Sequence, residues 1–427
     1  MEWSDIMSVQ HFQNRRQKYL ERVEVGSCTI LFAGEAPHKT TDQYYPFTIN
    51  KSFFYLTGLA KQQFILVLLK GESKTFEFLF IEEASDYATK WLGKRMTKTE
   101  ASQISGIQES NILFLDAFDG FLTNQVMAAS RKALIRTPQT IYLDLYRHKP
   151  LAKSYGFQRM TNFLASYPEC TVKNTNQIMD SLRMYKDDFE IQAMSHAIEY
   201  AKIGIHTLYQ SVKVGQNERQ LQALFQYTIQ NAGSEGFSFN PIIASGAHAT
   251  TLHYEENDSV IEDNTLVLCD LGTLHQEYAS DITRTFPANK TFTPRQKQLY
   301  QMVLDVNKAC IEFVKPGIFM ADLNQYAKSL LAKKALEIGL ISDLTQIDRY
   351  YYHNVSHYLG LDVHDVGTYD QALKPGIVLT IEPGIYVEEE GIGIRIEDNV
   401  LVTETGHRNL SQAIIKEVDE IEHFMKS

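Results

Sequence analysis

Two stretches of the sequence decide the fold: Leu-Val-Leu-Cys-Asp at residues 266–270 and Val-Leu-Thr-Ile-Glu at residues 378–382. Each is a short run of residues that favour a buried β-strand, and each ends on a carboxylate. A second acid follows each stretch, Asp281 after the first and Glu397 after the second. If each stretch turns back as a hairpin, its two carboxylates come to lie on neighbouring strands. The sequence therefore predicts two strand pairs that carry two acids each.

The elements that precede the two strand pairs follow the same order. Two helices come before each pair, and Thr293-Pro294 reads as an N-cap followed by proline at the first helical position. The expected helices begin at 186–188, 217, 293–294 and 322, and the expected strands cover 241–245, 265–286, 377–387 and 391–402. This repeated order indicates an internal duplication in which the two strand pairs lie side by side.

The first part of the chain has a different pattern, in which helical and strand-like segments alternate. A charged helix is expected over 9–25, and the strand-like runs cover 29–33, 64–69, 76–81, 112–115 and 140–145. Several of these runs are almost continuously apolar, as strands covered by helices on both faces are. We therefore predict an α/β protein in which residues 1–175 form an N-terminal α/β domain and residues 176–427 form a duplicated α+β catalytic domain.

Charge and composition exclude several classes of protein. Lys plus Arg number 41 against 52 Asp plus Glu, a net charge of −11, which disfavours binding to nucleic acid or to an anionic membrane surface. The longest apolar run, 64–69, is far shorter than the ~20 residues of a membrane span, and the N-terminus lacks the apolar core of a signal peptide. Four cysteines without a CxxC spacing indicate reduced thiols, so we expect a cytoplasmic protein.

The four acids predict a metal site. One acid at a strand end would be expected to face water, but four that converge repel one another unless cations lie among them. The segment from His353 to Gly367 adds three histidines, and Arg395 shares a strand face with Glu397. One imidazole and four carboxylates make an oxygen-rich ligand set that suits Mn²⁺ or a similar ion, and two divalent ions balance the four negative charges. Two metals that share a hydroxide form a hydrolytic site.

Several motifs resemble those of the dinuclear "pita-bread" metallopeptidases. The matching segments are Asp270, 281–286, the His357 segment, 381–384 and 395–398. Leu252-His253-Tyr254 and 362–367, which includes His364, resemble the branch formed by aminopeptidase P and its near neighbour prolidase. Segments 45–58 and 91–95 are similar to that branch more weakly. One departure is the hairpin turn at 274–277, which lacks the Asn-Gly of many members.

The resemblance implies a role for each candidate residue. It implies five metal ligands: Asp270, Asp281, His357, Glu382 and Glu397. Glu382 would also act as general base and proton shuttle, and His253 and His364 would bind the substrate carbonyl and the developing oxyanion. His353 would line the proline pocket or make a structural hydrogen bond. Arg395 would orient a ligand carboxylate, whereas Tyr386 is expected to be an ordinary buried aromatic residue.

The function implied by this resemblance is a metallo-aminopeptidase that hydrolyses the Xaa-Pro bond at the N-terminus of peptides with a hydroxide held by two divalent ions, most simply Mn²⁺. The runner-up is an Xaa-Pro dipeptidase (prolidase), which differs in whether the cleft is blocked beyond the proline. A non-catalytic binding protein or a creatinase-like hydrolase would be expected to lack metal ligands, and all five are present. Family members associate through the N-terminal domain, which also forms a cleft wall, so a homodimer or homotetramer is expected.

Overall fold

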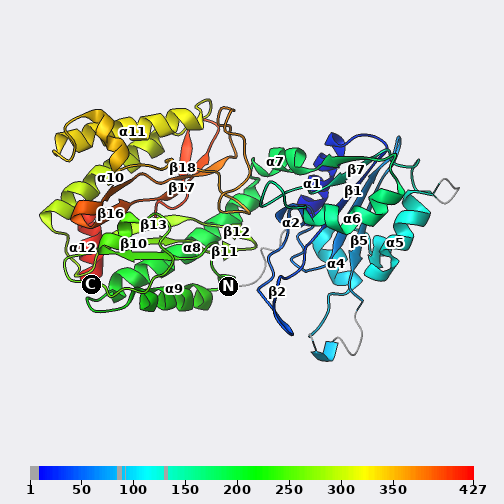
Figure 1. The fold of residues 1–427 in the computed structure, drawn as a ribbon, viewed down its shortest axis with the longest axis horizontal. Coiled ribbons are helices and arrows are strands. Elements are labelled where there is room, and N and C mark those ends of the chain that lie inside the picture. The colour runs from blue at the N-terminus through cyan, green and yellow to red at the C-terminus, as the bar shows by residue number, and fades with distance from the viewer. Residues whose placement is uncertain (1–8, 84–88, 92, 129–132) are drawn as a thin grey trace. The chain divides into compact units, whose positions relative to one another are not determined.

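The computed structural model describes residues 9–83, 89–91, 93–128 and 133–427, and the chain forms two compact units (Figure 1). The units are Met1–Arg183 and Met184–Ser427. The sequence placed this division at 175/176, eight residues earlier, and the difference is α7 (Asn176–Arg183), which packs against α1 (Val9–Arg22) in the first unit. Leu92, within one of the weakly matching segments, lies outside the described residues. No helix of the described residues is both long and apolar enough to cross a lipid bilayer.

The first unit is built on a six-stranded mixed sheet with the strand order β6-β5-β4-β1-β7-β8. Only β4 runs antiparallel to its neighbours. The strands are β1 (Ser27–Phe32), β4 (Ile65–Lys70), β5 (Thr75–Ile81), β6 (Ile112–Phe114), β7 (Thr140–Leu143) and β8 (Thr171–Asn174), with a separate hairpin of β2 (His38–Thr40) and β3 (Gln43–Tyr44). All five predicted strands are confirmed; β8, which is short and half-exposed, was not predicted.

Helices cover both faces of this sheet, as the apolar strands predicted. Thr29 of β1 faces α1, where its hydroxyl lies 3.1 Å from the Tyr19 hydroxyl. Its neighbours Cys28 and Ile30 point to the opposite face and pack beneath α5 and α6, because side chains alternate along a strand. Other α-helices among the described residues of this unit include α2 (Lys51–Thr57), α4 (Lys98–Ser105), α5 (Phe118–Phe121) and α6 (Tyr155–Ser166).

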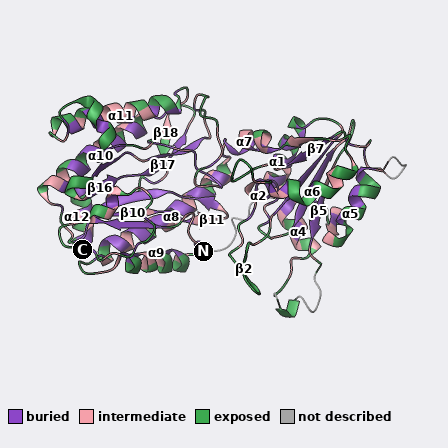
Figure 2. Cartoon of the chain, viewed as in Figure 1, coloured by how far each residue is buried: buried purple, intermediate pink, exposed green. Residues whose placement is uncertain are grey.

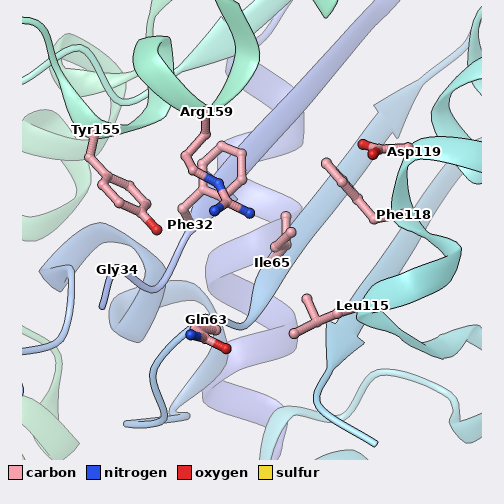
Figure 3. Close-up of a pocket in the computed structure, with 9 residues that line it drawn as sticks. All are labelled: Phe32, Gly34, Gln63, Ile65, Leu115, Phe118, Asp119, Tyr155 and Arg159. Atoms are coloured by element: carbon pink, nitrogen blue, oxygen red, sulfur yellow. The ribbon is translucent and has the colours of Figure 1, made fainter. Parts of the chain in front are cut away.

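A pocket of about 200 Å³ opens in the first unit between α5 and α6. Arg159 of α6 lies over the Phe32 ring, with its guanidinium carbon 5.9 Å from the ring centroid, and Figure 3 shows Asp119 of α5 at another edge of the pocket. Both charged side chains are exposed to solvent. None of the site residues predicted from the sequence lines this pocket, since all of them lie in the second unit.

The second unit contains the predicted duplication. The first half consists of α8 (Asp188–Ser211), α9 (Glu218–Ala232) and the sheet β13-β10-β9, with β9 at Ile242–Ser245, β10 at Leu266–Leu271 and β13 at Ile282–Pro287. The second half consists of α10 (Pro294–Phe313), α11 (Met320–Glu337) and the sheet β14-β17-β18, followed by α12 (Val418–Lys426). In this sheet β14 covers Val378–Ile381, β17 covers Asp398–Val402 and β18 covers His407–Asn409. Thr293 caps α10 and forms a capping box with Gln296, which confirms the predicted helix start. In each half the two helices pack against each other.

The strands of the second unit lie within one continuous core. Figure 2 shows the strands in the buried colour, whereas the outward faces of the surrounding helices are exposed. The core joins apolar side chains from both halves, including Val267 of β10, Leu379 of β14 and Val303 of α10. Because both halves share this core, the ends of their strands are held in fixed positions relative to each other.

The second strand pair is interrupted at two facing positions. Two strand segments, β14 (Val378–Ile381) and β15 (Gly384–Val387), pair with β17 (Asp398–Val402) and β16 (Ile392–Arg395), respectively. The sequence predicted continuous strands here, and that detail is wrong. Pro383 has no N–H to donate to a ladder. The N–H groups of Glu382 and Glu397 bond outside their own hairpin, to the carbonyls of Val355 at 2.8 Å and Thr283 at 3.0 Å.

The first strand pair ends in a tight turn that lacks Asn-Gly. The turn joins β11 (Leu274–His275) to β12 (Tyr278–Ala279), and its central residues Gln276 and Glu277 have φ of 49° and 66°. These left-handed conformations are the ones that Asn-Gly normally supplies. The Glu235 carboxylate accepts both central N–H groups at 3.1 Å. A distant side chain therefore stabilises the turn in place of the missing local residues.

We expect Gly393→Ala to destabilise the second unit. Gly393 lies in β16 against the short helical turn Gly246–Thr250, and a Cβ at this position would be 1.9 Å from the Ala249 carbonyl oxygen. Because the obstacle is backbone, the cost should reach the upper part of the about 1–3 kcal/mol typical of overpacking. Thermal unfolding would measure it. Gly406→Ala, where a Cβ meets nothing within 4 Å, is the control and should leave the Tm unchanged; equal shifts in both variants would contradict the packing.

Candidate metal centre

One pocket in the second unit brings together every site residue predicted from the sequence. Its volume is about 370 Å³, and it lies where the ends of the two strand pairs meet. The predicted residues that line it are His253, Asp270, Asp281, His353, His357, His364, Glu382, Arg395 and Glu397. His196, His206 and His275 do not line it. The topology thus converts acids that are far apart in sequence into one cluster.

The backbone around Asp281 is held by a single amide. Asp281 directly precedes β13, and its N–H donates to the side-chain oxygen of Asn399 at 3.2 Å. The Asn399 side-chain NH₂ donates back to the Asp281 carbonyl at 2.6 Å. Asn399 follows Asp398 on β17, so this amide ties the first strand pair to the second. The Asp281 carboxylate itself takes no part in these bonds.

The carboxylates and one imidazole lie close enough to share a cation. Asp281, His357 and Glu397 each offer one possible metal-ligand atom, a carboxylate oxygen or an imidazole nitrogen, and these three atoms lie within 4.8 Å of one another. The Nε2 atom of His357 lies 3.4 Å from Asp281 Oδ2 and 3.6 Å from Glu382 Oε1. Its Nδ1–H donates to the Tyr358 carbonyl at 2.9 Å, which leaves Nε2 as the free ligand atom facing the acids.

Burial and mutual repulsion make this cluster unfavourable by itself. Burial, followed by repulsion from Asp270 and Glu382, raises the pKa of Asp281 well above its usual range. Burial and then repulsion from Asp281 raise the pKa of Glu397 in the same way. Burial also raises the pKa of Glu382, although His357 and Arg395 oppose the shift. Groups this close cannot all ionise without compensating positive charge.

Three buried carboxylate oxygens have no hydrogen-bond donor among the described residues. They are Oδ1 of Asp270, Oδ1 of Asp281 and Oε1 of Glu397. A buried polar atom without a partner is costly, and such atoms in native proteins call for an explanation. Oxygen atoms are the ligands that hard divalent cations prefer. The unpartnered oxygens, together with the free His357 Nε2, therefore fit a divalent metal ion.

Arg395 is the positive group nearest to the acids. Its guanidinium donates to Asp270 Oδ2 at 2.6 Å, to the Thr283 hydroxyl at 3.2 Å and to the Tyr386 hydroxyl at 2.9 Å. Burial opposes its charge, but the surrounding Tyr386 and carboxylates outweigh burial and raise its pKa, so Arg395 stays protonated. This geometry matches the expectation that Arg395 orients a carboxylate, here that of Asp270.

The histidines around the acids are held in defined orientations. His353 Nδ1–H donates to the Asn354 carbonyl at 2.8 Å, so its Nε2 accepts from the Tyr386 hydroxyl at 2.9 Å. Burial, with a smaller effect from Arg395, lowers the pKa of His353 to about 4. Burial also lowers the pKa of His364, whose ring centroid lies 4.2 Å from that of His357. Both imidazoles are therefore neutral at pH 7.

Two residues of this site were missed by the sequence interpretation. Tyr386, expected to be an ordinary buried aromatic, is buried but also links Arg395 to His353. The Thr283 hydroxyl donates to Glu397 Oε2 at 2.7 Å. The register pairs Gly384 with Arg395, which puts Tyr386 two residues along the same face. That register was the signal for Tyr386, but it could not be read from one strand alone.

Comparison with known proteins gives the same picture over the whole chain. The profile of Metallopeptidase family M24 matches residues 192–404, and that of the Aminopeptidase P, N-terminal domain matches residues 12–135. The chain is 31% identical to Xaa-Pro aminopeptidase 3 of Dictyostelium discoideum, over 99% of this chain and 84% of that protein. These matches confirm the predicted fold class, an N-terminal α/β domain followed by a pita-bread domain.

Two solved structures are similar throughout. The structure of a candidate aminopeptidase P from Bacillus anthracis has a TM-score of 0.94 and 42% identity, and covers 98% of this chain and 99% of that one. Aminopeptidase P from Escherichia coli with the inhibitor Pro-Leu has a TM-score of 0.89 and 29% identity, with 98% of each chain covered. The likeness therefore includes both units of the chain.

Replacing one acid should stabilise the metal-free protein. Glu397→Gln keeps the shape of the side chain but removes an acid that, without metal, must either stay charged beside other acids or be protonated against its usual pKa. We therefore expect the free energy of unfolding without metal to rise by about 1–3 kcal/mol. Thermal unfolding of chelator-treated protein would measure this gain, and the same variant should lose the stabilisation that added Mn²⁺ gives the wild type. Glu388→Gln, at an exposed glutamate, is the matched control and should change neither quantity. A metal-free Glu397→Gln that is less stable than the wild type would contradict the repulsion.

Proposed function

The chain belongs to the aminopeptidase P family of metallopeptidases, and from that premise we propose that it removes the N-terminal residue of peptides whose second residue is proline. It is a metallo-aminopeptidase. The observation that carries the proposal is the group of buried, unpartnered carboxylate oxygens beside His357, which has the composition and the charge of a metal site. The proline specificity is supported by relatives named Xaa-Pro aminopeptidase and by the Escherichia coli enzyme, whose structure contains Pro-Leu.

The proposed ligand set holds two divalent ions, for which Mn²⁺ suits the oxygen-rich donors best. The ligands would be Asp270, Asp281, His357, Glu382 and Glu397. Four carboxylates match the charge of two divalent ions, and Arg395 leaves Asp270 Oδ1 free by occupying only Oδ2. When bound, such a pair supplies a hydroxide nucleophile at neutral pH and polarises the carbonyl under attack.

Glu382 is the proposed proton carrier. Burial raises its pKa above the usual range of a glutamate, so its carboxylate can take up a proton more readily and release it again. In the reaction it would accept the proton of the attacking water and deliver it to the proline nitrogen as the peptide bond breaks. The nearby Thr380 hydroxyl lies 3.5 Å from Glu382 Oε1, on the strand that ends at Ile381.

Two histidines of the pocket, His253 and His364, are the proposed substrate-binding groups. A neutral imidazole has an N–H that can donate to a carbonyl oxygen or to the oxyanion that develops from it, and it does not repel a neighbouring cation. His253 and His364 line the pocket on this account as donors to the substrate. His353 differs, because both its ring nitrogens already have protein partners, which favours a role in shaping the proline side of the pocket.

The same geometry suits a proline-directed enzyme. The Xaa-Pro bond is a tertiary amide with no N–H, so an enzyme that grips the amide N–H cannot recognise it. A site that acts on the carbonyl oxygen through metals and histidines does not need that proton.

Three further expectations remain predictions. They are the homodimer or homotetramer, the role of the N-terminal unit in assembly and as a cleft wall, and the cytoplasmic location.

A metal and substrate assay tests the proposed function directly. Chelator-treated protein should hydrolyse no Xaa-Pro peptide, and Mn²⁺ should restore turnover as a metal count approaches two per chain. The restored enzyme should cleave a tripeptide such as Ala-Pro-Ala much faster than the dipeptide Ala-Pro. Full turnover in the metal-free protein would refute the metal centre. A preference for the dipeptide would instead make the protein an Xaa-Pro dipeptidase.

His357→Ala separates the ligand role from a structural one. Loss of a metal ligand should lower kcat/KM by more than the about 100-fold seen for groups that only support ligands, and should lower the metal count. Far-UV circular dichroism should remain unchanged, because the His357 side chain bonds only to the Tyr358 carbonyl and to the acids. The exposed His423→Ala serves as the control and should keep full activity. Unchanged turnover in His357→Ala would refute the assignment.

A further inference from the structure

A buried amide on α10 contacts both interrupted strands of the second strand pair. Asn307 is fully buried, and its side-chain NH₂ donates to the carbonyls of Ile381 and Ile396, each at 3.1 Å. These two residues directly precede Glu382 and Glu397. Both carbonyls lie at the interruption between the two paired segments, which only the Ile396 N–H to Pro383 carbonyl bond at 3.3 Å crosses among the backbone bonds of the described residues. A single side chain thus satisfies the backbone at both interruptions.

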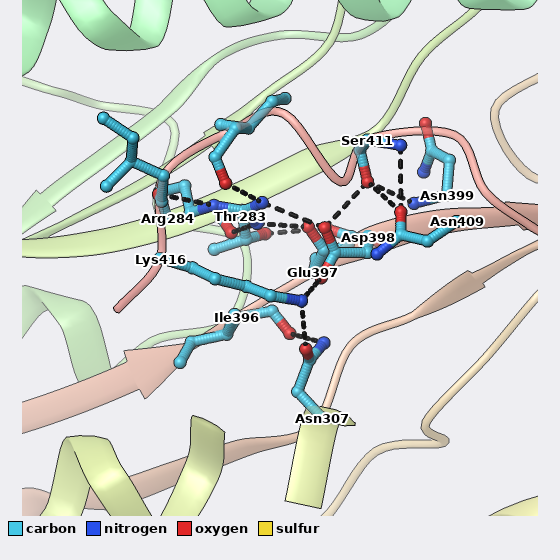
Figure 4. Close-up of polar contacts among 12 residues, drawn as sticks. Thr283, Arg284, Asn307, Ile396, Glu397, Asp398, Asn399, Asn409, Ser411 and Lys416 are labelled. Carbon is cyan, nitrogen blue, oxygen red and sulfur yellow. Dashed lines mark hydrogen bonds and ion pairs between the residues drawn. The ribbon is translucent and has the colours of Figure 1, made fainter. Parts of the chain in front are cut away.

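The Asn307 amide is itself fixed by a buried ionic network (Figure 4). Lys416 Nζ donates to Asn307 Oδ1 at 2.8 Å and to Asp398 Oδ2 at 2.6 Å. Asp398 Oδ1 accepts from Arg284 at 2.9 Å, and Arg284 also donates to the Glu397 carbonyl at 2.5 Å. Figure 4 shows Asn307 and Lys416 on one side of Glu397 and Asp398, and Arg284 on the other.

The charges of this network are well compensated. Burial alone would raise the pKa of Asp398, but Arg284 and Lys416 outweigh it and lower that pKa well below its usual range. Asp398 is therefore ionised and paired on both sides, in contrast to the unpartnered acids of the pocket. A buried polar network in which every member has partners is rigid, because each bond restricts the others. The network can therefore hold an adjacent residue in one position.

The two hydrogen bonds that the Asn307 side chain donates set the distance between the Ile381 and Ile396 carbonyls. Both of its protons belong to one planar group, so the two carbonyls that accept them are held at a separation fixed by that plane. Each carbonyl is one peptide unit from a proposed metal ligand. This amide, which bonds to neither carboxylate, thereby constrains the separation of Glu382 and Glu397 together with the backbone bonds of these two residues. Independent water molecules or separate side chains could satisfy the same carbonyls without this constraint.

We propose that Asn307 is a positioning residue for the metal centre, which sets the spacing of Glu382 and Glu397 while Lys416 and Asp398 hold its amide in place. The inference rests on the proposed function, because it takes the two glutamates as metal ligands. Metal sites tolerate errors in ligand position of only about 0.2 Å. Disturbing groups that orient ligands typically weakens metal binding by about 10–100-fold.

Asn307→Asp tests this role. The aspartate keeps the size of the side chain and can still accept from Lys416, but it cannot donate to Ile381 or Ile396. Its added negative charge would by itself attract cations, so weaker metal binding in this variant cannot be an effect of charge. Titration of metal-stripped full-length protein with Mn²⁺, followed by calorimetry and by the Mn²⁺ paramagnetic resonance signal, should give a dissociation constant about 10–100-fold higher than the wild type.

Kinetics of the same variant provide a second readout. At limiting Mn²⁺ the variant should lose turnover, and at saturating Mn²⁺ much of kcat should return, while KM for the peptide stays within about twofold of the wild type. A general loss of folding would not produce this split. Gln296→Glu is the matched control, since Gln296 is a buried amide on the same helix whose NH₂ donates at 2.7 Å to the Asn264 carbonyl, away from the ligand strands. Its Mn²⁺ affinity should remain that of the wild type.

The outcomes are distinguishable. Folded Asn307→Asp protein with wild-type Mn²⁺ affinity overturns the inference, as does an equal loss of affinity in Gln296→Glu. If circular dichroism shows that Asn307→Asp does not fold, Lys416→Gln decides, because the Lys416 side chain is 13% exposed and its change disturbs packing less. Weaker Mn²⁺ binding in Lys416→Gln supports the inference, and unchanged binding overturns it. A wild-type protein that binds no Mn²⁺ refutes the metal centre itself.

Discussion

Repulsion among carboxylates that the fold forces together is the constraint on which the rest of the second unit depends. Asp270, Asp281, Glu382 and Glu397 come from two halves of a duplicated structure, and the shared core leaves them no room to separate. Arg395 pairs with one oxygen of Asp270 but offsets only one of the four charges. Such a cluster is stable only when it is protonated or when it holds cations. The fold therefore holds an unfavourable arrangement of acids that bound divalent metal relieves.

Several groups that hold these acids bind the main chain and not the carboxylates, whereas Arg395 and Thr283 each occupy one carboxylate oxygen, of Asp270 and Glu397 respectively. Asn399 bonds the N–H and the carbonyl of Asp281, Asn307 bonds the carbonyls before Glu382 and Glu397, and Arg284 bonds the carbonyl of Glu397. If these donors bonded the carboxylates instead, the oxygens would be occupied and the acids would lose their capacity as ligands. These backbone bonds set the position of the acids, while the carboxylate oxygens stay available as metal ligands. Side chains with no bond to the carboxylates can therefore still affect the site.

A feature could be predicted from the sequence when neighbouring residues determine it, and could not when residues remote in the chain determine it. The strands, the capped start of α10 and the identity of the acids depend on neighbouring residues, so the alternation around Arg395 and Glu397 and the apolar run before Asp270 were sufficient. Pro383 was a local sign that the strand after Ile381 is interrupted, but the N–H groups of Glu382 and Glu397 bond to Val355 and Thr283, which are remote partners. Tyr386 joined the site through strand register, and the turn at Gln276 is stabilised by Glu235. Each of these needs a pairing that no local pattern contains.

Burial shifts the pKa values of the acids and of the histidines in the pocket in opposite directions, but both shifts favour a neutral side chain. It raises the pKa of Asp281, Glu382 and Glu397 and lowers that of His353 and His364, and every one of these shifts favours the neutral form. The metal-free pocket therefore sheds charge by protonating its acids. A cation reverses this for the acids, because ligands must be deprotonated to bind, whereas His353 and His364 are already neutral. Metal uptake is consequently coupled to proton release from the carboxylates. The low dielectric that makes the acids unfavourable by themselves is also what strengthens their attraction for the metal.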